Sequence, residues 1–371
     1  MDFTYSEEHQ AVADLAAQII AEHCDPARLS RLEREGWFDR DLWSALAAAG
    51  MLGIALPESV GGAGLDTLAL HPILQAVGAN AAHVPLAETL LAALVVDRHG
   101  SAAQCQALLP GVVSGQLVLT VALVDDEPAD LHTPSARLQP GPGNTHSLTG
   151  VKTLVPCAAL ADRHLVSAST PDGGVALVLV DPSRRDVEVV AQETPSDVPH
   201  ARVTYADVPI DSRDVVGALD GAALATLINH GRSALASLQV GVVMEAVRLA
   251  AQHTGQREQF GRQIATFQAV SQRVADARIA AGMLDLVALQ AAWRLAQGMA
   301  CADELAIAGW WTGEAGHGVL HAVHHVHGGI GVDRDYPLHR LFGRAKQYEF
   351  ALGGSSQHLV DLGHSLAAQP A

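Results

Sequence analysis

Two segments in the last third of the chain carry residue types suited to holding a phosphate group. Arg257 precedes a Phe-Gly pair at 260–261, and a His-Gly-Gly-Ile-Gly-Val turn follows at 327–332. A pyrophosphate carries two negative charges and is bound by a guanidinium together with backbone N–H donors. Arg257 would supply the guanidinium, and Gly328 and Gly329, which lack a Cβ, would let the backbone approach. Taken singly, Arg257 would merely start a helix connection and the glycines would form an ordinary turn.

Present together and in this order, the two segments resemble those by which acyl-CoA dehydrogenases bind the ADP half of FAD. The stretch 264–268 and the run Asp-Tyr-Pro-Leu-His-Arg at 335–340 extend the resemblance, which covers essentially the whole chain. In that family these residues act across a dimer interface, on the FAD of the neighbouring subunit. The resemblance implies FAD as the cofactor. The residues it implies for the adenosine end are Arg257, Phe260, Gln268, His325, Gly328 and Gly329.

The position of the catalytic base is the main departure from the family. Acyl-CoA dehydrogenation requires a carboxylate that takes the α-proton while flavin N5 accepts the β-hydride. The resemblance places this base at Leu352 or, as in a minority of relatives, at Gly231. Neither side chain can take a proton. Glu349 is the nearest acid, but on a helix it points about 60° away from the required direction. It is therefore only a weak candidate, and the catalytic residue stays unassigned.

Two stretches that hold the flavin ring in the family are altered as well. The usual Thr-Glu-Pro strand end is replaced by residues 124–130, in which only Glu127-Pro128 matches, and the usual Trp-Ile-Thr stretch is replaced by Leu-Val-Pro at 154–156. The proline removes a backbone donor, and the aromatic shield is missing. Ser355, after the Gly-Gly pair, keeps a hydroxyl where the family contacts the flavin.

One explanation covers all of these changes. The chain would be the subunit of a heteromeric acyl-CoA dehydrogenase that lends its ADP-binding residues to FAD in a homologous, glutamate-bearing partner. The stretches 332–340 and 352–356 resemble actinobacterial relatives that dehydrogenate steroid side-chain CoA thioesters as α2β2 heterotetramers. Two alternatives stay open: a homotetrameric dehydrogenase with an unrecognised base, and a non-catalytic family member that binds CoA esters or a partner protein. The family also implies electron-transfer flavoprotein as the electron acceptor.

Imidazole and guanidinium groups gather near the second of the two segments. Histidines stand at 317, 321, 324, 325 and 327. Two pairs among them have the i,i+4 spacing that can bind a metal, but no glutamate completes a His-Glu-x-x-His motif. We therefore expect no metal, and assign these histidines to FAD phosphates or a subunit interface. The arginines of 334–344 would pair with Asp333 and Asp335, or would contact CoA phosphates.

The composition argues against several classes of function. The chain has 371 residues, of which 49% are hydrophobic and 17% charged, as expected for a globular protein of two or three packed units. Its formal net charge of −17 argues against nucleic acid or an anionic membrane as partner. The N-terminus lacks the features of a signal peptide, and no apolar run reaches the ~20 residues of a membrane span. A cytoplasmic protein with four reduced cysteines is expected.

Hydrophobic periodicity predicts an α+β multidomain fold in the order helix, sheet, helix. We expect an N-terminal helical domain over 1–115, a middle antiparallel β-barrel or sandwich over 116–214 and a C-terminal four-helix bundle over 215–371, as in the acyl-CoA dehydrogenase architecture. The predicted helices cover 4–22, 41–49, 67–79, 104–114, 222–256, 262–296, 300–326, 336–350 and a short segment from 355. The predicted strands cover 117–124, 147–156, 164–168, 175–180, 187–192 and 201–205. Ser6 and Asp66 are candidate N-caps.

Overall fold

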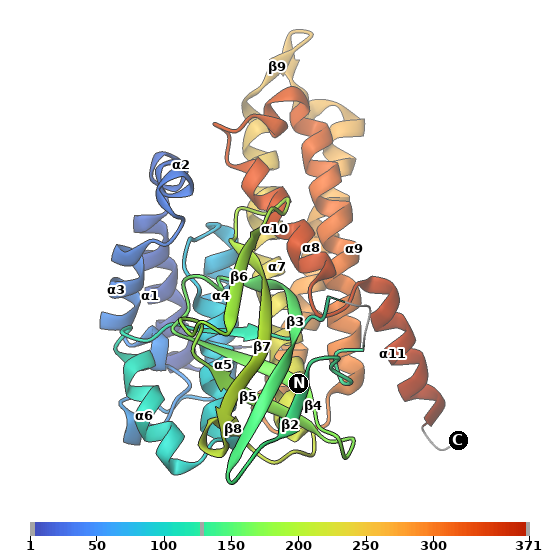
Figure 1. Cartoon of the computed structure of the whole chain (residues 1–371). Helices are drawn as coiled ribbons and strands as arrows, with labels where there is room; N and C mark the ends of the chain where they lie inside the picture. Colours follow the sequence, from blue (N-terminus) through green and yellow to red (C-terminus); the bar gives the residue numbers. More distant parts are fainter. Residues whose placement is uncertain (1–3, 127–129, 369–371) are drawn as a thin grey trace.

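A β-sheet stands in front of helices that come from both ends of the chain (Figure 1). The computed structural model describes residues 4–126 and 130–368. The N-terminal helices are α1 (Glu7–His23), α2 (Pro26–Glu35), α3 (Arg40–Ala48), α4 (Leu70–Ala79), α5 (Leu86–His99) and α6 (Ala102–Val113). The C-terminal helices are α7 (Ala222–Gln256), α8 (Gln268–Ala296), α9 (Ala302–His327), α10 (Leu338–Phe350) and α11 (Ser355–Ala368).

Both predicted N-caps are confirmed. The Ser6 hydroxyl accepts a hydrogen bond from the His9 N–H at 3.2 Å and begins α1. The Asp66 carboxylate accepts from the Leu68 N–H at 3.0 Å and begins a 3₁₀ turn that leads directly into α4. Each side chain satisfies a backbone donor that the first helical turn leaves without a partner.

The sheet is mixed rather than purely antiparallel, which corrects one detail of the prediction. Its strands in the described residues are β1 (Leu119–Ala122), β2 (Arg137–Pro140), β3 (Thr145–Pro156), β4 (Arg163–Ser169), β5 (Val175–Val180), β6 (Val187–Gln192), β7 (His200–Asp211) and β8 (Val215–Val216). The order is β6-β7-β3-β2-β4-β5-β8, with β1 beside β4. Strand β4 pairs in parallel with both β1 and β2. Strands β2 and β3 form an antiparallel hairpin, so β2 and β4, which precede and follow β3, run in the same direction.

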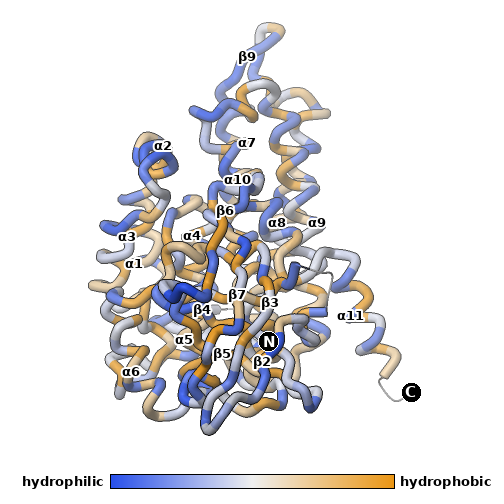
Figure 2. Tube along the Cα trace, in the orientation of Figure 1, coloured by the Kyte–Doolittle hydropathy of each residue, from blue (hydrophilic) through white to orange (hydrophobic). Residues whose placement is uncertain are grey.

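The segment before α8 is a hairpin and not the predicted first turns of a helix. Strands β9 (Glu258–Gln259) and β10 (Arg262–Gln263) pair antiparallel, and the turn between them holds Phe260 and Gly261 at positive φ. A 3₁₀ turn then leads to α8. This hairpin protrudes from one end of the molecule (Figure 1), and its strands are mostly hydrophilic (Figure 2).

The helices from the two ends of the chain share one hydrophobic core, while a second core belongs to the sheet. The closest approach is between α4 and α7. A Cβ on Gly78 would overlap the carbonyl oxygen of Leu238, and a Cβ on Gly241 would overlap that of Gln75. Glycine at both positions lets the two backbones touch. Segments 1–115 and 215–371 are therefore packed together in space. The predicted domain boundaries at 115 and 214 stay a prediction.

Two helices, α7 and α8, are long and apolar enough to cross a membrane when judged by length and composition alone. The apolar window of α7 is 72% buried, which makes it the central core helix. The α8 window is only 28% buried, and Ile279, Met283 and Leu286 are exposed on it. Charged residues are spread along α8 at 273, 276, 278, 285 and 294, which favours contact with another protein over burial in lipid.

Candidate functional site

A cavity of about 510 Å³ lies where α5, α7 and α10 meet the edge of the sheet. Its walls are mostly apolar, with contributions from Leu91, Leu123 and Leu238. A smaller set of polar side chains also reaches it: Trp37, Glu88, Thr194, Ser196, His200, Arg344, Lys346, Gln347 and Tyr348. The size and the mixture of groups are those of a small-molecule site.

The two positions at which the sequence predicts the catalytic base meet in this cavity. Gly231 on α7 and Leu352, just after α10, both line it. A Cβ added to Gly231 would lie 2.6 Å from the Leu352 Cδ1 atom. Leu352 adopts a positive φ of 55°, a conformation that a leucine rarely takes, at the turn that ends α10. The fold thus brings these two positions, distant in sequence, into contact, and neither carries a carboxylate.

Glu349 lies elsewhere. It is not among the lining residues, and its carboxylate accepts a hydrogen bond from Lys346 Nζ at 2.6 Å. The same ammonium lies 2.8 Å from Nδ1 of His317. The Glu349 side chain packs against Gly313 of α9, where a Cβ would lie 3.6 Å from its Cγ. The carboxylate is therefore directed at α9 and is part of an ion pair.

Replacing Glu349 by Gln is expected to change dehydrogenase activity by less than about twofold, because only a partly exposed ion pair is lost. The measurement is acyl-CoA-dependent dye reduction by this chain purified with its homologous partner. A fall of about a hundredfold or more would instead identify Glu349 as the base, since a general base contributes at least that much. Glu304→Gln is the control, because it breaks the partly exposed ion pair with Arg294 and neither residue lines the cavity.

The strand end that corresponds to the ring-holding stretch of the family is committed to internal contacts. The Asp125 carboxylate accepts from the fully buried Lys152 Nζ at 2.7 Å and from the Ser135 N–H at 3.1 Å. Burial lowers the pKa of Lys152, and Asp125 opposes this shift. The Glu127-Pro128 match lies outside the described residues.

The second ring-holding stretch has also lost its free donors. The Leu154 N–H donates to Oε1 of Gln192 at 2.8 Å, and Nε2 of Gln192 donates to the Thr153 hydroxyl at 2.9 Å. Pro156 has no N–H. Leu154 itself is in the positive-φ region and about half exposed. The backbone donors of Thr153 and Leu154 are therefore already used within the protein.

The six residues predicted to hold the ADP half belong to the end of α7, the β9 hairpin, the start of α8 and the end of α9. The hairpin marks one end of the molecule (Figure 1). All six are exposed, and Phe260 at the hairpin tip is 92% exposed. The ends of α7 and α9 are joined there by His253 and His327, whose rings stack at 4.6 Å. Gly328 ends α9 with a φ of 65° and a ψ of −142°, a combination that only glycine adopts readily.

Ser355 is separate from this group. It begins α11, and its hydroxyl donates to the Trp310 carbonyl oxygen of α9 at 3.4 Å. It lies against Gly313 and is not among the lining residues of the cavity. The structure therefore brings together six of the seven predicted cofactor-binding residues and leaves Ser355 apart.

The histidines near the end of α9 are engaged by their own helix. The imidazoles of His324 and His327 each lie 2.8 Å, through Nδ1, from a backbone oxygen four residues earlier. The other nitrogen of His327 lies 3.0 Å from the Tyr336 hydroxyl. His317 and His321 are close, with ring centroids 4.4 Å apart. These contacts fix the end of the helix beside the glycine turn.

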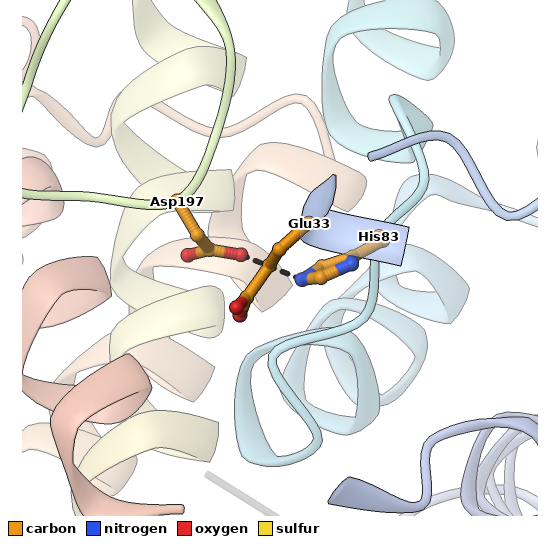
Figure 3. A group of neighbouring side chains, drawn as sticks. All are labelled: Glu33, His83 and Asp197. Carbon is orange, nitrogen blue, oxygen red and sulfur yellow. Dashed lines mark ion pairs between the residues drawn. The ribbon is translucent and has the colours of Figure 1, made fainter. Parts of the chain in front are cut away.

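A different trio, Glu33, His83 and Asp197, has the closeness of a metal site (Figure 3). Two arginines already neutralise it. Arg344 forms a fork with Asp197, from Nε at 2.7 Å and Nη2 at 2.8 Å, and Arg340 Nε lies 2.6 Å from Glu33. A permanently charged guanidinium excludes a second cation from the same carboxylate. The cluster is an ion-pair network.

This network fixes the charge of Asp197. Burial alone would raise the pKa of its carboxyl, but Arg344 and His83 outweigh burial and hold that pKa well below its usual range. His83 Nε2 lies 2.7 Å from the carboxylate, at an angle that falls short of a good hydrogen bond. Through Arg340 and Arg344, the network ties α10 to α2 and to the loop between β6 and β7.

Comparisons with known proteins give the class. The acyl-CoA dehydrogenase N-terminal domain matches residues 6–116, and the acyl-CoA dehydrogenase C-terminal domain matches residues 221–366. The acyl-CoA dehydrogenase FadE27 of Mycobacterium tuberculosis is 41% identical, with 100% of both chains covered. A chain of the ChsE4-ChsE5 complex from the same organism superposes with a TM-score of 0.95 at 38% identity, again over 100% of both. A variant of the Tcur3481-Tcur3483 steroid ACAD gives a TM-score of 0.92 at 40% identity, covering 97% of this chain and 98% of that one.

The fold and the matched segments define an FAD-dependent oxidoreductase of the kind that acts on acyl-CoA thioesters. The chain belongs to the acyl-CoA dehydrogenase family. The related structures include a chain of a two-protein complex and a steroid ACAD. Within this family, the present residues suit the two halves of FAD differently. An exposed arginine and an open glycine turn suit the ADP half, whereas Leu154, Pro156 and Leu352 suit neither the ring nor the base.

Proposed function

We propose that this chain is the subunit of a heteromeric acyl-CoA dehydrogenase that lacks the catalytic glutamate. It would contribute the six ADP-binding residues to an FAD whose ring lies in a homologous partner, and that partner would supply the glutamate. The substrate would be an acyl-CoA thioester, the electron acceptor an electron-transfer flavoprotein and the compartment the cytoplasm. The name of one related structure, a steroid ACAD, supports a steroid side chain as the acyl group.

The observation that carries this proposal is the separation of the two half-sites. Arg257 follows Gly231 by 26 residues of continuous helix α7, which corresponds to about 39 Å. One dinucleotide does not span that length, so the six ADP-binding residues would serve a cofactor whose ring lies in another subunit. Because neither Gly231 nor Leu352 carries a carboxylate, that subunit would be a different chain that bears the glutamate. The six ADP-binding residues are exposed, and Arg257 forms no ion pair within the described residues, which supports their use at an interface.

A homotetramer with an unrecognised base is the second candidate, and the observation that favours it is the retained cavity. A family member that merely binds a partner would have no need of an apolar space of about 510 Å³ beside the former base positions. The ion pair of Glu349 removes the base considered so far, which weakens this candidate.

The test is the FAD content of this chain expressed alone and expressed together with a glutamate-bearing homologue. One FAD for each pair of unlike chains, with little flavin in the chain alone, is the expected result. The visible flavin spectrum and the ratio of flavin to protein give the answer. One tightly held FAD in each lone chain would contradict the shared site and would favour the homotetramer. A colourless co-purified complex would leave only a non-catalytic role.

A further inference from the structure

One acid in the cavity has no part in the function proposed above. Glu88 lies in the first turn of α5 and is the only acid among the lining residues. Its side chain is enclosed by protein, yet it keeps intermediate exposure, because what remains accessible faces the cavity. A carboxyl in this position is costly unless something binds it.

The other polar groups of the lining already have partners inside the protein. Arg344 is held by Asp197, Lys346 by Glu349, and Gln347 by Ser196. The remaining bonds join Trp37 to Asp197, Thr194 to the backbone oxygen of Ser196, His200 to that of Val198, and Tyr348 to Arg344. For Glu88, the only bond found among the described residues is to its own backbone N–H. Glu88 is thus the polar group left to face a ligand.

The place of Glu88 in the cavity also fits a ligand. Leu91, one turn further along α5, lies 4.0 Å from where a Cβ of Gly231 would stand. Glu88 precedes Leu91 by about one helical turn, or roughly 5 Å along the axis, and therefore lies on the same side of α5. Burial raises the pKa of Glu88, against smaller opposing effects of its own N–H and Arg344, and this favours the neutral acid. A neutral acid can donate one hydrogen bond and accept others.

We propose that this cavity binds an apolar molecule that bears one neutral oxygen substituent, a ketone or a hydroxyl, and that Glu88 hydrogen-bonds that oxygen. The apolar walls take the body of the ligand, and the volume of about 510 Å³ is within the usual range for small molecules. An ammonium group is disfavoured by the nearby Arg344 guanidinium. Because no flavin is needed for this binding, the inference stands apart from the shared-cofactor function.

The test uses displacement of a neutral fluorophore, N-phenyl-1-naphthylamine, from the full chain purified with its partner. Decanone, decanol and chlorodecane are three competitors of similar length. Decanone and decanol are expected to bind about five- to tenfold more tightly than chlorodecane, as one hydrogen bond provides. Glu88→Leu should abolish this preference while the fluorophore still binds. Glu314→Gln, at an exposed position of α9, is the control and should change nothing.

The pH dependence of binding also distinguishes a ketone from a hydroxyl group. A ketone needs the proton of the neutral acid, so decanone should bind more weakly as the pH rises through the raised pKa of Glu88. Decanol can donate to the carboxylate and should keep its affinity. In Glu88→Gln the amide donates at every pH, so decanone binding should lose its pH dependence. If Glu88→Leu does not fold, the Glu88→Gln variant still tests the role of Glu88.

Two results would overturn the inference. One is a wild-type complex from which none of the three competitors displaces the fluorophore. The other is a Glu88→Leu or Glu88→Gln variant with the wild-type preference and pH dependence. Flavin content should be the same in all variants, so failure here is distinct from failure of the shared FAD site.

Discussion

Replacing Asp197 by Asn is expected to destabilise the chain by about 3–5 kcal/mol, because the buried Arg344 guanidinium loses its counter-charge. Urea unfolding followed by tryptophan fluorescence measures the change. Asp126→Asn is a matched control, since Arg202 grips Asp126 by the same two-point fork at an exposed place. That variant should be nearly as stable as the wild type, because solvent screens an exposed ion pair. Equal losses in the two variants would contradict the importance of burial.

The cost of Asp197→Asn should also depend on pH. The pKa of Asp197 in the folded chain is below its value in the unfolded chain, so its contribution is present above the unfolded pKa and is lost as the pH falls. The unfolded value is about 3.9. The difference between wild type and variant should therefore be constant between about pH 5 and 8 and shrink below about pH 4. A difference that persists unchanged well into acid would contradict this assignment.

Replacing Arg257 by Ala is expected to weaken FAD binding in the two-chain complex by about 10- to 100-fold, the effect of one charge-assisted hydrogen bond to phosphate. Equilibrium dialysis of the complex with FAD measures it. The stability of the chain itself should change by less than about 0.5 kcal/mol, because the side chain is exposed.

Arg185→Ala is the control for Arg257→Ala. Arg185 is 98% exposed and lies between β5 and β6, away from the hairpin. Its loss should leave FAD affinity unchanged. Wild-type affinity in the Arg257 variant would show that this guanidinium does not bind the pyrophosphate, whereas equal losses in both variants would point to a general effect of net charge.

The helices that the sequence identified are those with a distinct apolar stripe or an end signal. Helix α7 begins and ends where the periodicity predicted, at 222 and 256. Helix α5 was missed because apolar residues surround it, so that no stripe stands out, and nine of its fourteen residues are buried. Helix α2 was missed because it is mostly polar and buries only Leu29. Strand β2 has a single buried residue, Leu138, and gave no alternation to detect.

The site was predictable where a motif fixes the position and unpredictable where only the fold creates the contact. Motif spacing located Gly231 and Leu352, which touch in the cavity. The partners of Arg340 and Arg344 were predicted among neighbouring aspartates, and this was wrong for both. Their acids stand 307 and 147 residues away in sequence, and no local pattern indicates them. Glu88 could have been noticed in the sequence as a single acid within the otherwise mostly apolar stretch 84–96, although this pattern is only a weak indication of a site.

The contact of Gly78 and Gly241 between α4 and α7 has a consequence for how related subunits can exchange parts. Each glycine accommodates backbone from the other helix, so a larger residue at either of these two positions would force the helices apart. Recombination between paralogous genes within the sheet would join an N-terminal segment to a foreign C-terminal one and test this fit directly. Hybrids that keep both glycines retain a close α4–α7 contact, and hybrids that lose one do not. A functional hybrid is therefore expected to take both ends of the chain as a matched pair, although about a hundred residues of sheet lie between them.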